Sequence, residues 1–251
     1  MDVLVSVVVV SILIAIMLPG LSQVRDTARK VACSSNQRQL GLVTAIYAGD
    51  HRDLLPPSVF TLEDAYVFDK LDVPVTSLVL RFDVGKMPPP PIAANDGWDG
   101  WGSLFWGGQL TAPEVLYCPA HEEDVTFAEY APQFQTPAGL IYGNFEYRGE
   151  GASGERRLSE LRPNSALGSD AFGGLGWVNH DDGLNTLTAS LSVAWKSNAR
   201  IGSTLADAIK SRTGSSPTVE DYQEPLRRFE EMWRDLDSIN LRDPADDERV
   251  D

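Results

Sequence analysis

Residues 1–50, MDVLVSVVVVSILIAIMLPGLSQVRDTARKVACSSNQRQLGLVTAIYAGD, decide the fold that we predict for this chain of 251 residues. From Val3 to Val24 the stretch has no charged side chain, and most of its side chains are apolar. A helix that crosses a bilayer needs about 20 such residues, and a backbone in lipid must satisfy its own hydrogen bonds. The sequence therefore predicts that residues 1–24 form a membrane-spanning helix.

The helical pattern continues beyond this apolar segment. Apolar side chains recur at steps of three and four residues, as in one stripe of an amphipathic helix, namely Leu21, Val24, Ala28, Val31, Leu42 and Ile46. Pro19 predicts a kink, and Asp50 followed by Pro56-Pro57 marks the end of the helix. We expect one helix of roughly 45 residues, about 70 Å long, whose amphipathic half is residues 25–57.

The remaining residues predict a globular body and an acidic tail. Residues 58–200 are expected to form an α+β domain in which the long helix packs on an antiparallel sheet. A short strand is predicted at 76–84, and a short strand or a strand end at each of 115–119, 141–145 and 166–170. In residues 186–195, TLTASLSVAW, apolar and polar side chains alternate strictly, which predicts one half-buried antiparallel strand. In residues 97–108, GWDGWGSLFWGG, tryptophans lie among glycines and are expected to be core anchors rather than sugar-stacking groups.

Charge limits the classes of partner. The chain has 21 basic and 36 acidic residues, a formal net charge of −15, and so acidic a surface repels phosphates and excludes nucleic acid as a partner. Residues 201–251 form an acidic, partly helical extension, with twelve acids and five bases from Pro217 onward. Its helical stripe is Leu226, Phe229, Trp233 and Leu236. This segment is either a solvated helix with a frayed tail or a docking helix for another subunit.

The N-terminal residues resemble a known group of proteins. An acidic residue enters an apolar run, L-P-G-L follows, and then A-R-x-x-A-C-x-x-N-x-x-Q-L-G. This order resembles the N-terminal helix of type IV pilin-like proteins, and more closely the pseudopilin-like DUF1559 group with its H-X9-DG motif. The matching positions are Asp2, Leu18, Pro19, Leu21, Ala28, Arg29, Cys33, Asn36, Gln39, Leu40, Gly41, Tyr47 and Pro56.

The resemblance extends into the body. His180, Gly183 and Asn185 match the group's H-x-x-G-x-N opening, but Ser190-Leu191 stands where the group has Asp-Gly. An Asp-Gly would form a tight hairpin turn, so its absence suggests one longer strand or a different turn. The resemblance is specific over residues 1–57, moderate over 110–195 and absent after about 200.

The resemblance implies a structural role and not an enzyme. It implies a pseudopilin-like subunit with a single pass through the inner membrane and an extracytoplasmic C-terminal domain, assembled with other pilin-like subunits into a structure of the type II secretion or type IV pilus kind. Asp2 and Pro19 belong to the assembly motif, and Asp2 would neutralise the amino terminus of a neighbour. It also implies a basic leader upstream of Met1, which a prepilin peptidase removes before N-terminal methylation.

Cys33 and Cys118 also match cysteines of the group. In an extracytoplasmic domain they form a disulfide between helix and body, or else they are two separate buried thiols. No cofactor is expected. Asp181 and Asp182 are weak candidates for calcium ligands, and a polar turn with a locally bonded His180 is the simpler interpretation. Cys118-x-x-His121 has ligand-like spacing, but two ligands do not make a zinc site.

One other class of function stays open. No G-x-S-x-G, phosphate-binding glycine loop or H-E-x-x-H occurs in the sequence, so nucleophilic and metalloprotease chemistry find no support. The alternative to a structural subunit is a membrane-tethered domain that binds a glycan or similar ligand through the Trp-rich loop and the region of His180.

Overall fold

The computed structural model describes most of the N-terminal helix and the body of the chain. The described residues are 2–58, 78–83, 92–121, 125–137, 139–151, 153–171, 179–180, 183–197, 233–234 and 236–237, without the side chains of 2–4, 17–20, 22, 92 and 93. The statements that follow refer to these residues.

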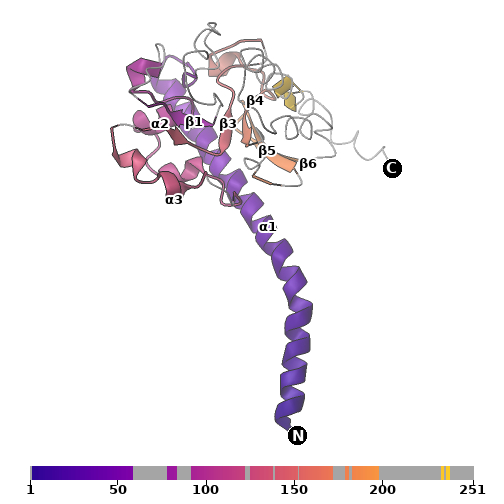
Figure 1. Ribbon diagram of the computed structural model, residues 1–251. Coiled ribbons are helices and arrows are strands. Elements are labelled where there is room, and N and C mark those ends of the chain that lie inside the picture. Colours follow the sequence, from indigo (N-terminus) through magenta and orange to yellow (C-terminus); the bar gives the residue numbers. More distant parts are fainter. Residues whose placement is uncertain are drawn as a thin grey trace, which may run out of the picture.

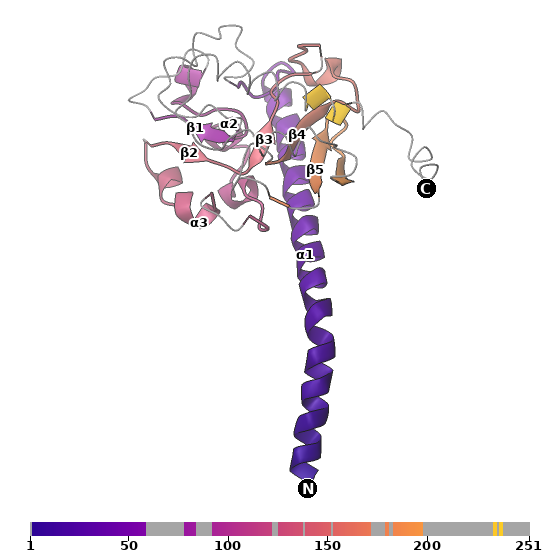
Figure 2. The ribbon, with the colours of Figure 1, turned by 45° about the vertical axis from the view of Figure 1, so that its right-hand side comes forward.

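Helix α1, Asp2–Asp50, is the longest element of the structure. Its N-terminal half projects from the body as a gently curved rod, and its C-terminal half lies against the body (Figures 1 and 2). The helix is unbroken through Pro19. It ends where Arg52 and Asp53 adopt positive φ angles of 57° and 68°, a backbone conformation that commonly stops a helix.

The expected membrane span is wrong. Among the described residues, no helix is long and apolar enough to cross a membrane. Two expectations are therefore corrected: that the first half of the N-terminal helix spans a membrane, and that the chain is a single-pass inner-membrane protein.

Two antiparallel sheets form the body. The larger has the strand order β3-β4-β5-β6, and α1 packs against its last three strands. Its strands are β3 Phe145–Tyr147, β4 Ala166–Asp170, β5 Gly183–Thr188 and β6 Val193–Ser197. The smaller sheet pairs β1 Val79–Arg81 with β2 Ile141–Tyr142. The short helices are α2 Gly102–Trp106 and α3 Phe127–Tyr130, with 3-10 turns at Ile92–Asn95, Pro113–Leu116, Gln133–Gln135 and Leu158–Glu160.

The strand predictions have mixed outcomes. The strand at 166–170 is confirmed by β4. Residues 141–145 divide between β2 and β3, because Gly143 and Asn144 separate the two strands. The strand predicted at 115–119 is wrong, because a 3-10 turn begins at Pro113 and runs to Leu116. Proline fixes the backbone torsion that such a turn needs at its start.

The apolar stripe that the sequence predicts on α1 faces away from the body. Its large side chains are 52–64% exposed, and they are Leu21, Val24, Val31, Leu42 and Ile46. The helix instead buries another face, which mixes apolar, small and polar residues, namely Cys33, Gln37, Leu40, Gly41, Thr44, Tyr47 and Ala48. Helix α1 therefore has two distinct packing faces, and the body covers only one of them.

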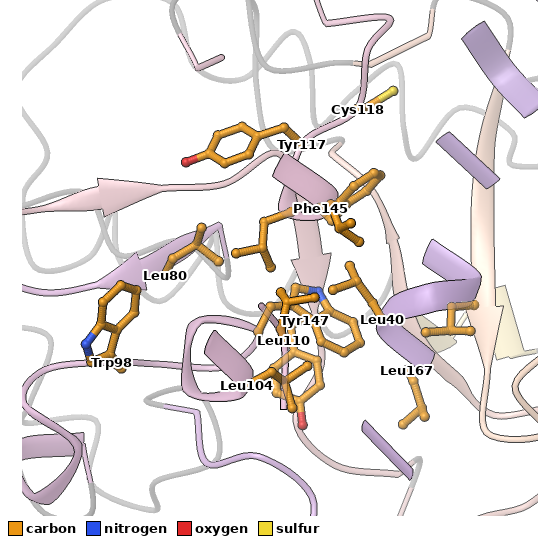
Figure 3. Packing of buried hydrophobic residues seen from close by; sticks show 14 of the residues in the cluster. Leu40, Leu80, Trp98, Leu104, Leu110, Tyr117, Cys118, Phe145, Tyr147 and Leu167 are labelled. Atoms are coloured by element: carbon orange, nitrogen blue, oxygen red, sulfur yellow. The ribbon is translucent and has the colours of Figure 1, made fainter. Parts of the chain in front are cut away.

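The core of the body is aromatic. Figure 3 shows Trp98, Tyr117, Phe145 and Tyr147 packed around aliphatic side chains that include Leu40 of α1. Trp98 and the neighbouring Trp101 are 5% and 2% exposed, which confirms the core interpretation for these two residues. The third tryptophan of the predicted loop, Trp106, is 46% exposed and donates its indole N–H to Asp96.

The single strand predicted over residues 186–195 is wrong, and the alternative of a different turn is confirmed. The chain turns back after Thr188, so the segment divides between β5 and β6 and the two strands pair as a hairpin. Leu191 makes this turn possible with a φ of +63°, and the Thr188 N–H donates to the carbonyl of Ser192 across it. Alternation of apolar and polar residues continues through the turn, which is why the pattern did not reveal it. Leu191 adopts a left-handed conformation that glycine adopts more easily.

A short piece of the C-terminal extension docks on the body. Trp233 and Leu236 are 1% and 0% exposed. Asp237 forms an ion pair with Arg148 at 2.7 Å and accepts a hydrogen bond from the Ala166 N–H of β4. The described part of the predicted stripe therefore packs on its own chain; Leu226 and Phe229 lie outside the described residues.

The turn at Leu191 predicts an unusual order of stability. Leu191→Ala and Leu191→Gly remove the same side-chain contacts, and only glycine adopts a φ of +63° without steric cost. We expect the glycine variant to be more stable than the alanine variant by about 1 kcal/mol, as measured by chemical denaturation. Equal stabilities, or a more stable alanine variant, would contradict the turn.

Candidate functional site

The carboxylate of Asp170, at the end of β4, lies at the centre of a buried polar cluster. Its side chain is fully buried. The side chains around it come from α1, from residues 179–180 and from β5. We call this group the Asp170 cluster, and its members are Gln37, Asp170, Asn179, His180 and Asn185.

Three side chains and one backbone group hold the carboxylate. Gln37 of α1 donates its amide N–H to Oδ1 at 2.8 Å, and Asn179 donates to the same oxygen at 3.5 Å. Asn185 of β5 donates both its backbone and its side-chain N–H to Oδ2, at 2.6 and 2.9 Å. A buried carboxylate is costly unless donors surround it, and here donors from three parts of the chain converge on one side chain.

Burial and hydrogen bonding act in opposite directions on this group. Burial raises the pKa of the Asp170 carboxyl and the hydrogen bonds from Asn185, Asn179 and Gln37 lower it, with a net rise from 3.8 to about 6. His180 faces the carboxylate as well, with Nε2 at 3.4 Å from Oδ2. The carboxyl and the imidazole therefore face each other inside the buried cluster.

A disulfide between Cys33 and Cys118 lies directly beside the cluster. The two Cα atoms are 4.9 Å apart, and the bond joins α1 to the body across 85 residues of sequence. Cys118 Sγ lies 3.6 Å from His180 Nε2. Of the two alternatives open at the sequence level, the structure has the disulfide.

Asparagine side chains fix the backbone around Cys118. Asn144 accepts a hydrogen bond from the Cys118 N–H at 2.5 Å and donates to the carbonyl of Val125. Asn36 of α1 donates to the carbonyl of Tyr117 at 2.9 Å, and Asn179 donates to the carbonyl of Asn144 at 2.6 Å. The disulfide and the Asp170 cluster thus belong to one connected polar network between helix and body.

The arrangement is not that of a catalytic cysteine. In a nucleophilic relay the two ring nitrogens of histidine have separate partners, whereas here the single atom Nε2 of His180 faces both the sulfur and the carboxylate. Both sulfurs are bonded to each other, and the residues are buried. What the geometry offers instead is four potential ligand atoms within 4.8 Å of one another, from Cys33, Cys118, Asp170 and His180.

The structure brings together some of the residues that the sequence singled out. Cys33, Cys118, His180 and Asn185 meet around Asp170. Gly183 lies at the start of β5, where an added Cβ would come within 2.2 Å of the Lys196 carbonyl oxygen, so only glycine fits there. His121 is buried but is not among these four ligand residues.

The other candidates remain apart or undescribed. The calcium candidates Asp181 and Asp182 lie outside the described residues, and so do the side chains of Asp2 and Pro19. Gln37 was missed by sequence reasoning, although a signal for it exists. It follows Cys33 by four residues and therefore shares its helix face.

Comparisons of the chain with models of known families, with curated proteins and with solved structures found no match.

Removal of the disulfide should lower stability substantially. In the chain-entropy model, a link across 85 residues contributes about 4–5 kcal/mol. We expect the double variant Cys33→Ala, Cys118→Ala to lose about that much unfolding free energy in denaturant titrations without added metal. The reduced wild-type chain is the matched control and should have the same stability as the double variant. A double variant as stable as the oxidised wild type would contradict the assigned role.

Asp170 should make stability depend on pH. Because its pKa is higher in the folded chain than in the unfolded one, its favourable contribution is complete below about pH 4 and is lost as pH rises through about 6. The unfolding free energy of Asp170→Asn should therefore rise by up to about 3 kcal/mol relative to wild type between pH 4 and pH 7. The variant also carries a cost that does not depend on pH, because its amide does not match the donors around it.

The measurement is the difference in unfolding free energy between variant and wild type across this pH range. The same difference should be recorded in a His180→Gln background, because His180 also faces the carboxylate. A difference that stays constant with pH in both backgrounds would contradict the raised pKa.

Proposed function

We propose that this chain is a pilin-like structural subunit that assembles with other copies of itself through α1, without enzymatic activity. The observation that carries the proposal is the projecting half of α1. Residues 5–16 are all exposed, and ten of these twelve side chains are apolar. The large ones among them are 49–69% exposed.

A helix that is apolar on all sides is stable in water only when another apolar surface buries it. Such helices are found buried among other apolar surfaces. Full burial of one Val, Leu or Ile side chain is worth about 1.5–3 kcal/mol, so a few of them per copy offset the cost of association of about 4–15 kcal/mol. The Ser11 hydroxyl donates to the carbonyl of Val7 within the same helix, so it enters an apolar interface without losing its partner.

The outer stripe of α1 extends this surface along the body. Leu21, Val24, Val31, Leu42 and Ile46 are exposed on the side of the helix that the sheet does not cover. Beside Leu42, a hollow of about 230 Å³ lies between α1 and residues 109–115, and Val43, Leu110 and Val115 line it. An apolar side chain from the helix of a neighbouring copy would fit such a hollow.

The charge distribution favours contact between copies in a staggered arrangement. Helix α1 contains four bases and three acids, so the other residues contain 17 bases and 33 acids. Arg25 and Arg38 are exposed on the helix. The basic middle of one α1 therefore complements the acidic remainder of another copy, which steers association and helps to set register.

The resemblance to pilin-like proteins supports the same assignment, since their N-terminal helices form the core of the assembly. It also implies a contact between Asp2 and the amino terminus of a neighbour, on which our proposal does not depend. The alternative of a glycan-binding domain has less support, because Trp98 and Trp101 are core residues.

The assembly can be tested by charge substitution on the projecting helix. Val8→Asp and Ile12→Asp place a carboxylate in the proposed interface, where an unpaired charge costs several kcal/mol. We expect the wild-type full-length chain to sediment as large assemblies and both variants to sediment as monomers.

Gln135→Asp is the matched control, because it adds the same charge at an exposed position of the body. It should assemble as the wild type does. The proposal fails if the wild type is monomeric, or if the Val8 and Ile12 variants assemble like the control.

A further inference from the structure

We propose that the reduced chain binds one thiophilic divalent cation such as Zn²⁺ through Cys33, Cys118, His180 and Asp170. This site lies in the body and is independent of the proposed assembly through α1. In the oxidised chain the same two cysteines form the disulfide.

The distances between ligand atoms suit a tetrahedral ion. With bonds of about 2.0–2.3 Å, neighbouring ligands of tetrahedral zinc lie about 3.3–3.8 Å apart. His180 Nε2 is 3.6 Å from Cys118 Sγ and 3.4 Å from Asp170 Oδ2. All four ligand atoms lie within 4.8 Å of one another, so small side-chain movements complete the tetrahedron once the two sulfurs separate.

The types of ligand select the ion. Two thiolates and an imidazole favour zinc over magnesium or calcium, which prefer oxygen ligands. All four residues are buried, and four protein ligands leave no open position for water. The site is therefore structural rather than catalytic.

The surroundings already contain the partners that such ligands need. The Ala120 N–H donates to Cys118 Sγ at 3.4 Å, a bond that also stabilises a thiolate. Asn185 and Gln37 hold the Asp170 carboxylate in place from both sides. Hydrogen bonds of this kind orient metal ligands and raise affinity.

The change between the two forms balances as a disulfide exchange. A dithiol reductant supplies two electrons and two protons, the S–S bond between Cys33 and Cys118 breaks, and the reductant becomes a disulfide. The two thiols then lose their protons to solvent as they bind the cation. The covalent link between α1 and the body is thereby replaced by a coordinate link at the same place.

Cobalt(II) provides a direct test, because it occupies zinc sites and has a characteristic absorption spectrum. The full-length chain is reduced with a phosphine, freed of reductant under anaerobic conditions and titrated with Co²⁺. We expect one Co²⁺ per chain, with the charge-transfer and d–d bands of tetrahedral thiolate coordination, and displacement by Zn²⁺. The oxidised chain should bind none, and Zn²⁺ should raise the Tm of the reduced chain.

The key variant is His180→Ala, which keeps both cysteines and can be purified and checked for folding in the oxidised form. It should weaken Co²⁺ binding by at least about tenfold. His51→Ala is the matched control, since His51 stacks on Tyr47 at the end of α1, and it should bind as the wild type does. Co²⁺ binding by the oxidised chain, equal affinity in the His180 variant, or a reduced chain that Zn²⁺ neither binds nor stabilises would each overturn the proposal.

Discussion

The burial of one carboxylate, that of Asp170, is the constraint on which the rest of the structure depends. A carboxylate with no access to water must be surrounded by donors. The donors here come from α1, from residue 179 and from β5. Each of these segments must therefore occupy a defined position relative to β4, and the carboxylate sets the register of the helix against the sheet. The disulfide at Cys33, one helical turn before Gln37, fixes the same face covalently.

This constraint explains why the most apolar stripe of α1 is not the one that the body covers. The covered face must place Cys33 beside Cys118 and Gln37 beside the Asp170 carboxylate. Only one orientation of the helix about its axis satisfies both contacts. The hydroxyl of Thr44 on this face donates a hydrogen bond to the carbonyl of Leu40 in the same helix. This polar side chain can therefore be buried against the sheet. The stripe that contains Val31 and Leu42 is left on the outside as a consequence.

Sequence reasoning predicted the elements whose signals are local. The helix up to Asp50 and the strand Ala166–Asp170 follow from periodicity and from residues that end elements. Residues 186–195 show where such signals fail, because strict alternation passes unchanged through a turn at Leu191 that no glycine marks. The direction in which the α1 stripe points was also beyond the sequence, since periodicity identifies a face and not its partner.

The candidate site was only partly predictable for the same reason. The resemblance identified Cys33, Cys118, His180 and Asn185 as separate motif residues, but nothing in the local sequence shows that they lie around one carboxylate. The convergence arises from the pairing of β4 with β5, which brings Asn185 beside the end of β4. Gln37 follows from helix geometry once Cys33 is known to face inward. The predicted membrane span is wrong, because no helix among the described residues is long and apolar enough to cross a membrane.

The position of the polar network also bears on the proposed assembly. The projecting half of α1 extends away from the described part of the body, so its direction follows from how the C-terminal half of the helix is held (Figure 2). A rotation of the helix by one residue would turn the outer stripe by about 100° and present a different face to a neighbouring copy. The disulfide and the Gln37–Asp170 hydrogen bond prevent such a rotation. The buried network therefore determines which surface of α1 is exposed, and a cation at the same four residues would preserve that geometry when the disulfide is reduced.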